Sequence, residues 1–301
     1  MGFKSFAPDA DRVLVPVTSR NAALAGIAFY APSGLRSARA QKIAWRATSL
    51  LGPRVLPGQT VQWAPPMGTE VWNELLANWR TVVGGLDGFA VFLRGGDEDL
   101  LRVLLLRDGE PVGHVKLKPC PGDSLAHEAR VLTLLSESRP RSFWFPGVLG
   151  RGEAGDWSFL VTRPLPRRLH RMAAEPGLAT IADEIHVGLS RLGRSAAAPR
   201  HWRPMHGELA PWTLRKGPEG ELVLTDWERV RQAPPGADEA FYKAAMAAVT
   251  RANPGPIHVR EALEFWRQRF LVGEAPRHLG ADFVARMLRA FNLMAGIEDD
   301  L

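Results

Sequence analysis

Two carboxylates at the ends of one short segment, residues 206–228, are the first candidates for chemistry in this sequence of 301 residues. The segment reads HGELAPWTLRKGPEGELVLTDWE, with Glu208 near its start and Asp226 near its end. The dipeptide Glu219-Gly220 separates two short runs of β-forming residues, which predicts two strands joined by a tight turn. Such a hairpin folds back on itself and can bring the two acids together. The alternative is that both acids are ordinary solvated loop residues.

A lysine and a glutamate further upstream form a second candidate pair. Lys116 falls in a predicted strand over 111–118, where a solvated lysine is the ordinary alternative. Glu128 falls in the apolar stripe of a predicted helix over 124–138, where buried residues are expected. A capping box does not explain this acid, because the box would need it at position 127, which is His127. An unpaired buried charge is costly, so Glu128 needs a cationic partner, and Lys116 is the candidate.

Length and composition bound the class of protein. A chain of this length can bury a large core and commonly forms two lobes or domains. The single cysteine, Cys120, excludes an internal disulfide framework and a cysteine-based metal cluster. No apolar run approaches the roughly 18 residues that span a bilayer, and the N-terminus lacks the apolar core of a secretion signal, so we expect a cytoplasmic protein without a transmembrane segment. The net charge of +6 favours anionic partners in a general way.

The elements that must position these residues fall into two groups. Strand patterns dominate first, at 89–93, 100–106, 111–118, 147–150 and 157–161. The dipeptide Asp108-Gly109 predicts a hairpin between the second and third of these strands. Helical patterns dominate afterwards, at 177–193, 237–250, 257–271 and 281–294. Strands first and helices later indicate an α+β chain with a sheet-rich lobe and a helical lobe.

The leader, residues 1–68, has a different character. It contains a predicted strand at 13–17 and an amphipathic helix over 35–51, and a further helix over 69–83 follows. One side of the amphipathic helix is basic, with Arg36, Arg39, Lys42 and Arg46, and the other is apolar, with Ala40, Ile43, Ala47 and Leu50. We expect the apolar side to be buried against the sheet lobe. The basic stripe over 36–46 is either a solvated face or a contact with an anionic surface. Nucleic-acid binding has only charge in its favour, and we do not expect it.

The order of these candidates resembles the protein-kinase-like fold, and most closely the aminoglycoside phosphotransferase and choline kinase group. That family shows H-G-D-x-x-x-x-N followed by a strand that ends in I-D-[WF]-[ED]. The matching residues here are His206-Gly207-Glu208, Thr213 and Asp226-Trp227-Glu228. The resemblance covers roughly residues 86–300 and implies a bilobal fold with an antiparallel sheet lobe and a helical C-terminal lobe. It implies an N-lobe over 86–165 and a C-lobe over 166–301. Residues 1–85 are an extension that we expect to pack on the sheet lobe, because the predicted strand at 13–17 and the apolar face of 35–51 need burial.

For the cofactor, the resemblance implies an ATP site in the N-lobe. Lys116 would bridge the α- and β-phosphates and would be held in place by Glu128. Arg163 and Leu165 would lie in the segment between the lobes, where backbone groups meet adenine. The turn at 94–99 has two glycines able to approach phosphates, but also three acids that would repel them.

For the chemistry, the resemblance implies that Asp226 and Thr213 hold Mg²⁺ and that Glu208 accepts the proton of the acceptor hydroxyl. His206 belongs to the same catalytic loop and would support it by hydrogen bonding. Two positions depart from the family, since Glu208 replaces an aspartate and Thr213 replaces an asparagine. The first change displaces the carboxylate by one methylene, and the second exchanges an amide oxygen for a poorer metal ligand.

Two functions therefore stand as hypotheses. The first is an ATP-dependent phosphotransferase whose partners are the nucleotide and a small hydroxylated acceptor, sugar or aminoglycoside-like. The second is a pseudokinase, a nucleotide-binding or scaffolding protein with an impaired catalytic loop. Retention of Lys116, Glu128 and Asp226 favours nucleotide binding in both cases.

Overall fold

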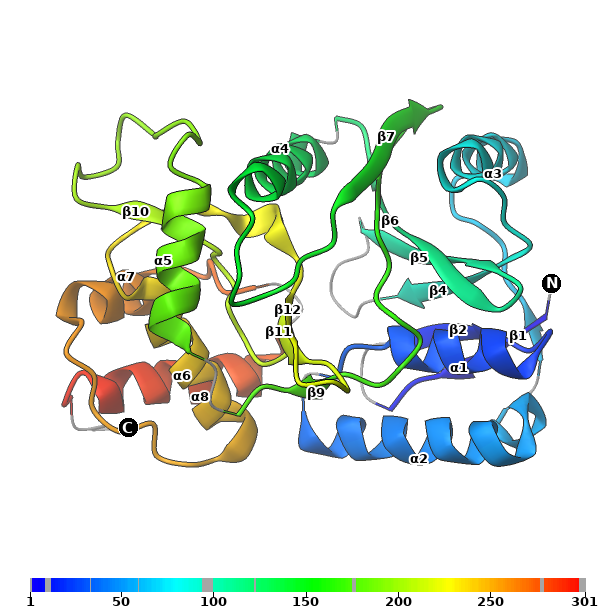
Figure 1. Cartoon of the computed structure of the whole chain (residues 1–301). Coiled ribbons are helices and arrows are strands. Elements are labelled where there is room, and N and C mark those ends of the chain that lie inside the picture. The colour runs from blue at the N-terminus through cyan, green and yellow to red at the C-terminus, as the bar shows by residue number, and fades with distance from the viewer. Residues whose placement is uncertain are drawn as a thin grey trace. The chain divides into compact units, whose positions relative to one another are not determined.

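A computed structural model of the chain describes residues 2–8, 12–32, 34–58, 60–93, 100–121, 123–174, 177–276 and 279–297. The chain divides into two compact units, labelled by element in Figure 1. The first contains Met1–Ala129 and Pro146–His170, and the second contains Arg130–Phe145 and Arg171–Leu301. The turn at 94–99 lies outside the described residues. Among the helices that the structure describes, none is long and apolar enough to cross a membrane.

An eight-stranded antiparallel sheet is the frame of the first unit, in the order β3-β1-β2-β4-β5-β6-β8-β7. Its strands are β1 (Gly2–Phe6), β2 (Arg12–Pro16), β3 (Val61–Gln62), β4 (Gly88–Leu93), β5 (Leu101–Arg107), β6 (Glu110–Pro119), β7 (Val148–Ala154) and β8 (Trp157–Thr162). The predicted hairpin at Asp108-Gly109 is confirmed, and both residues have the positive φ that a two-residue turn requires. The leader extends this sheet, since it supplies β1, β2 and β3.

Helices cover both faces of the sheet, because alternate side chains of each strand point to opposite sides. Helix α3 (Thr69–Val83) packs its buried Trp72, Leu75 and Trp79 against one face. Helix α1 (Arg20–Phe29), which Ser19 caps by accepting a hydrogen bond from the Ala22 backbone N–H at 3.1 Å, packs against the other. Figure 1 shows α3 on one side of the strands and α1 on the other.

Helix α2 (Leu35–Leu51) packs with the side opposite to the one we predicted. The expected burial of Ile43 and Leu50 is wrong, because these side chains are 69% and 76% exposed. The buried side instead carries Gln41, whose amide donates to the carbonyl oxygens of Ile27 at 2.9 Å and Tyr30 at 2.7 Å. These carbonyls lie at the C-terminal end of α1, where helix carbonyls lack intrahelical partners. Ala44 and Trp45 of α2 pack against the same core, so the buried face combines apolar contacts with these hydrogen bonds.

The basic residues of α2 are exposed together with its apolar ones. They are Arg36, Arg39, Lys42 and Arg46. The contact with an anionic surface that this stripe suggests stays a prediction.

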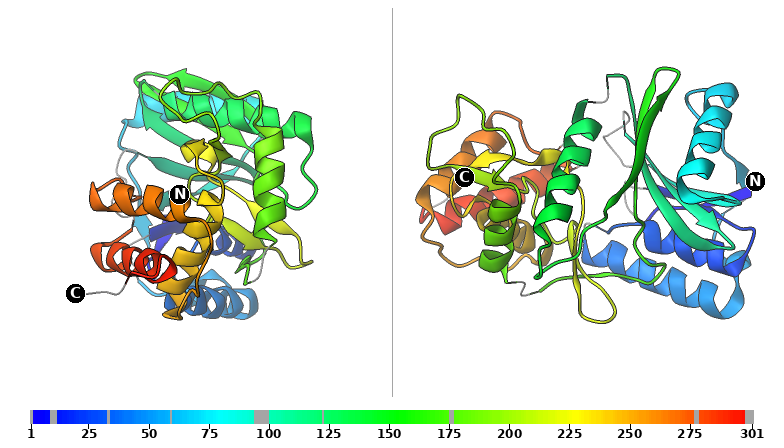
Figure 2. Two further views of the ribbon diagram at one scale, coloured as in Figure 1. Left: turned by 90° about the vertical axis from the view of Figure 1, so that its left-hand side faces the viewer. Right: turned by 45° about the horizontal axis from the view of Figure 1, so that its top comes forward.

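The second unit is mainly helical. Its helices are α5 (Leu178–Gly188), α6 (Ala237–Thr250), α7 (Arg260–Leu271) and α8 (Ala281–Met294), and helix α4 (Asp123–Ser138) crosses from the first unit into this one. Helices α6, α7 and α8 pack together around one apolar core (Figure 2). The short strands are β9 (Arg171–Met172), β10 (Arg203–Met205), β11 (Leu214–Lys216), β12 (Leu222–Leu224) and β13 (Arg231–Ala233), with a single 3₁₀ turn, η2, at Trp227–Arg229. The α+β class is therefore confirmed.

Candidate functional site

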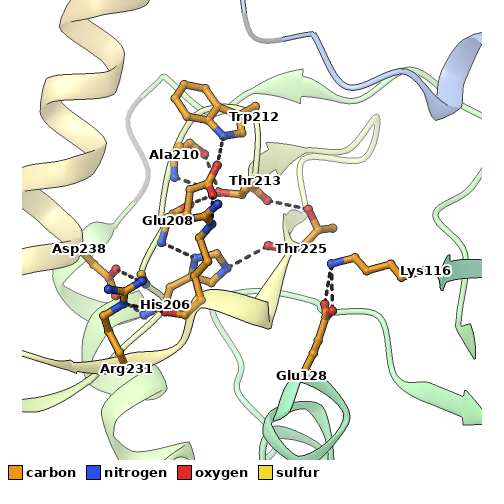
Figure 3. Close-up of polar contacts among 12 residues, drawn as sticks. Lys116, Glu128, His206, Glu208, Ala210, Trp212, Thr213, Thr225, Arg231 and Asp238 are labelled. Carbon is orange, nitrogen blue, oxygen red and sulfur yellow. Dashed lines mark hydrogen bonds and ion pairs between the residues drawn. The ribbon is translucent and has the colours of Figure 1, made fainter. Parts of the chain in front are cut away.

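The predicted ion pair between Lys116 and Glu128 is confirmed within the first unit. The Lys116 Nζ lies 2.9 Å from Oε1 and 3.0 Å from Oε2 of Glu128, and the two residues are only 4% and 3% exposed (Figure 3). Strand alternation explains the placement, because Val115 and Leu117 point into the core under α3 and leave Lys116 on the opposite face. A buried ammonium held between both oxygens of one carboxylate has a fixed position, as a phosphate-binding lysine requires.

His206 begins the second half of the candidate site, in the second unit. Its side chain is fully buried, its Nδ1 accepts from the Glu208 backbone N–H at 3.2 Å, and its Nε2 lies 2.9 Å from the Thr225 carbonyl oxygen. Because Nδ1 accepts, Nε2 carries the proton and donates to Thr225. Figure 3 shows His206 joining the loop to the segment that precedes Asp226. With both ring nitrogens engaged, His206 positions the loop rather than contacting substrate.

Asp238 anchors the same loop, and the sequence analysis did not single it out. Its carboxylate accepts hydrogen bonds from the backbone N–H groups of His206 at 2.8 Å and Gly207 at 3.2 Å. Burial raises the pKa of Asp238 to about 6, while these two hydrogen bonds act in the opposite direction. An acid in the first turn of a helix is usually a favourable charge near the helix N-terminus, so its type and position gave no separate signal.

The raised pKa of Asp238 predicts a specific pH dependence of stability. Between its ordinary value of 3.8 and about 6, the folded protein keeps a proton that the unfolded chain has lost. The contribution of Asp238 is therefore fully present below pH 3.8, falls by up to about 3 kcal/mol as the pH rises to 6, and is constant above that.

Urea unfolding of wild type and Asp238→Asn between pH 4 and 7 measures the contribution of Asp238 to the free energy of unfolding. The free energy of unfolding of wild type, minus that of the variant, should fall as the pH rises to 6 and then level off. A difference that stays constant over this range would show that Asp238 titrates normally.

Glu208 is buried, at 3% exposed, and both of its carboxylate oxygens are engaged. Oε1 accepts from the indole Nε1 of Trp212 at 2.8 Å, and Oε2 forms an ion pair with Nε of Arg229 at 2.9 Å. Neither partner could be recognised from the sequence, since an indole and an arginine carry no distinctive spacing here. Each carboxylate oxygen keeps a second lone pair, so Glu208 can hold these contacts and still accept a proton from a hydroxyl that reaches it.

The Thr213 hydroxyl is used inside the loop. It donates to the Glu208 carbonyl oxygen at 2.7 Å and accepts from the Ala210 backbone N–H at 2.9 Å, and the residue is fully buried. These contacts close the turn that leads into β11. A hydroxyl committed in this way is a weak candidate for binding a metal, so the arrangement does not favour the predicted metal role of Thr213.

Asp226 follows the predicted hairpin, which is confirmed by the antiparallel pairing of β11 with β12. Its backbone is left-handed, with φ 62° and ψ 61°, a conformation that aspartate adopts more readily than most residues. Trp227, fully buried, donates its indole N–H to the Leu224 carbonyl oxygen at 3.1 Å and fixes the segment. Strained backbone of this kind is concentrated at functional sites. In the described ranges, no group of three or more His, Cys, Asp and Glu residues could hold a metal ion by itself.

The remaining candidates lie directly after β8. The backbone N–H of Arg163 donates to the Gly147 carbonyl oxygen at 2.8 Å, and Leu165 is partly buried. Their contact with adenine stays a prediction. So does the cleft that would bring the Lys116 pair together with Glu208 and Asp226, because these groups belong to different units.

Comparison with known proteins gives similarity in structure only, since no protein family and no curated protein matches the sequence. A solved structure from Haemophilus somnus 129PT, described as a fructosamine-3-kinase, aligns over 74% of this chain and 97% of its own, with a TM-score of 0.49 and 12% identity. The structure of an aminoglycoside-3′-phosphotransferase of type VIII aligns over 74% and 100%, with a TM-score of 0.46 and 20% identity. The phosphotransferase APH(3″)-Id from Streptomyces rimosus, solved with ADP and streptomycin, aligns over 74% and 98%, with a TM-score of 0.43 and 16% identity.

The order and pairing of the chain's own elements carry the fold assignment. An antiparallel sheet places Lys116 on β6, the next helix carries its partner Glu128, and a His-Gly-acid loop precedes a hairpin that ends at Asp226. The chain's own elements therefore follow the order that the resemblance to the protein-kinase-like fold implied, and membership of that fold stays a prediction.

Proposed function

We propose that the chain is an ATP-dependent phosphotransferase whose acceptor is a hydroxyl group of a small molecule. The observation that carries the proposal is the buried ion pair of Lys116 with Glu128, at 2.9 and 3.0 Å. A buried ion pair gives little net stability compared with an apolar pair, so stability alone does not account for it. A function that needs a fixed ammonium, such as holding nucleotide phosphates, does account for it.

The residues present fit most of the parts that such a reaction needs. Lys116 would hold the nucleotide phosphates, and Arg163 and Leu165 would meet the adenine. Asp226 is the carboxylate suited to Mg²⁺, which when bound offsets the negative charge of the transferred phosphoryl group. Glu208 would orient the acceptor hydroxyl and accept its proton.

Binding of ATP with Mg²⁺ is the direct test of the proposal. At a nucleotide concentration of about 100 times the Kd, ATP should stabilise the protein by about 2.7 kcal/mol, which thermal unfolding detects. Asp226→Asn keeps the size of the side chain and removes its charge, so we expect it to abolish the additional shift that Mg²⁺ gives while leaving the shift with ATP alone. No shift at millimolar ATP, with or without Mg²⁺, would overturn the proposal.

A pseudokinase is the second candidate, and the contacts of Glu208 favour it. Both oxygens of this acid are occupied by Trp212 and Arg229, and the Thr213 hydroxyl is closed inside the loop. An acid that is only 3% exposed and is held by an indole and an arginine is suited to keeping the loop in shape.

The paired substitution Glu208→Asp with Thr213→Asn separates the two candidates, because it restores the residues typical of the family. If wild type transfers phosphate to an acceptor and the double variant is slower, Glu208 is the base of a working enzyme. Glu208→Gln should then lower turnover by about 10² or more with little change in ATP affinity. If wild type shows no turnover and the pair gains ATP hydrolysis, the natural chain is a pseudokinase.

A further inference from the structure

A cavity of about 510 Å³ in the second unit is lined by three arginines, two from the continuous stretch 228–232 and one from α7. Arg229 ends the 3₁₀ turn after Asp226, Arg231 begins β13, and Arg269 lies in the last turn of α7. Trp202 and Glu228 also line it. Like charges repel, and the protein offsets part of this positive charge itself, because Glu228 adds a carboxylate to the lining.

Two of the three arginines already have an acid as partner. Arg229 pairs with Glu208 at 2.9 Å, and Arg269 pairs with Glu274. Arg231 differs from them. Its Nε donates to the Arg229 carbonyl oxygen at 3.4 Å, a contact with a neutral group. Burial lowers the pKa of Arg231, and the charges of Arg269 and Arg229 lower it further, while Glu274 acts in the opposite direction.

The cavity is also tied to the catalytic loop. Arg229 contributes to its lining and holds the carboxylate of Glu208. Arg231 pairs in the sheet with Met205, the residue directly before His206. A ligand bound in this cavity would therefore contact Arg229, the residue that holds the acid we propose as the base.

The wall of the cavity suits the body of a small molecule. The indole of Trp202 is held by a hydrogen bond from its Nε1 to Glu261 at 2.8 Å, so its ring is fixed in place. A rigid aromatic surface next to guanidinium groups offers an apolar contact and charge-assisted hydrogen bonds together. Guanidinium groups bind phosphate and carboxylate by paired N–H···O contacts, and they repel a polycation.

We propose that this cavity binds an oxyanion group, phosphate or carboxylate, of the small molecule on which the protein acts. That this molecule is the phosphate acceptor rests on the proposed function, whereas the anion site itself does not. The proposal points away from polycationic acceptors of the aminoglycoside type and toward phosphorylated or acidic sugars and similar anions.

Calorimetric titration with small probes tests the site without any catalysis. The probes are inorganic phosphate, glucose 6-phosphate, glucuronate, unmodified glucose and kanamycin. We expect an anionic sugar to bind and glucose to bind at least about tenfold more weakly, because the charge-assisted contacts are lost. The comparison of glucose 6-phosphate with glucuronate shows whether phosphate or carboxylate is preferred.

Three variants assign the binding to the cavity. Arg231→Gln should lower the affinity for the anionic probe at least about tenfold. Arg231→Lys keeps the charge but not the planar guanidinium, so it should lower the affinity less. Arg260→Gln removes the same charge from an exposed position at the start of α7, outside the cavity, and should bind as wild type does. Thermal unfolding verifies that each variant is folded.

The outcomes separate this proposal from the proposed function. Three results would each overturn the anion site: none of the three anionic probes binds at millimolar concentration, wild type and Arg231→Gln bind equally, or kanamycin binds more tightly than the anions. ATP titrations of the same proteins report on the nucleotide site independently. If the protein binds an anion through Arg231 but does not bind ATP, the anion site stands and the proposed phosphotransferase function is rejected.

Discussion

Replacing Gly207 with alanine should destabilise the second unit by about 3 kcal/mol or more and should disrupt the loop that holds Glu208. Gly207 has φ +87°, and a Cβ atom there would lie 2.1 Å from the Arg229 carbonyl oxygen. No side chain tolerates that distance, so the backbone of the loop or of the 3₁₀ turn has to move. Urea unfolding followed by near-UV circular dichroism measures the loss, and soluble yield measures it if the variant does not fold.

Gly273→Ala is the matched control, because Gly273 has a similar φ of +80° but no atom within 4 Å of the added Cβ. Its free energy of unfolding should fall only by the cost of placing alanine in a left-handed conformation, about 1 kcal/mol. The difference between the two variants isolates the close approach of the loop to Arg229. If the two variants are equally stable, the close approach does not constrain the loop.

Lys116→Met should cost about 3–5 kcal/mol of stability, because it leaves the Glu128 carboxylate buried without the cation that offsets it. The same substitution should abolish nucleotide binding if Lys116 holds the phosphates. Chemical denaturation and ATP titration of the purified variant give the two quantities separately.

The double variant Lys116→Met with Glu128→Leu distinguishes the structural effect from the functional one. Replacing both charges with apolar groups of similar size should restore most of the stability, since neither group then needs a partner. It should not restore ATP binding. A double variant that binds ATP as well as wild type would show that the pair has no role at the phosphates.

The candidate site could be predicted from sequence where the signal was local. Glu128 lies in an apolar stripe, where a buried carboxylate needs a cationic partner. Strand alternation placed Lys116 on the face opposite to Val115 and Leu117. The dipeptide Glu219-Gly220 gave the hairpin that leads to Asp226, because turn conformation is decided by the residues within the turn.

Helix α2 shows where the local signal was misleading. The periodicity of apolar residues predicted that Ile43 and Leu50 would be buried. The buried side instead carries Gln41, which donates to two carbonyl oxygens at the end of α1, together with Ala44 and Trp45, which pack against the core around α1. The choice of face therefore depended on what α1 offers as a partner, which the count of apolar residues in 35–51 does not contain.

The sequence by itself determined the α+β class, the order of the motifs and the identity of the acids and the lysine, because these follow from periodicity, turn residues and spacing. The contact of Lys116 with Glu128 was also predicted, but only the tertiary structure decided what the other groups touch. It placed Trp212 and Arg229 on the two oxygens of Glu208, Asp238 under the loop, and Arg231 beside two further arginines. These partners come from segments distant along the chain or without a distinctive spacing, and folding alone brings their charges and hydrogen-bonding groups within reach.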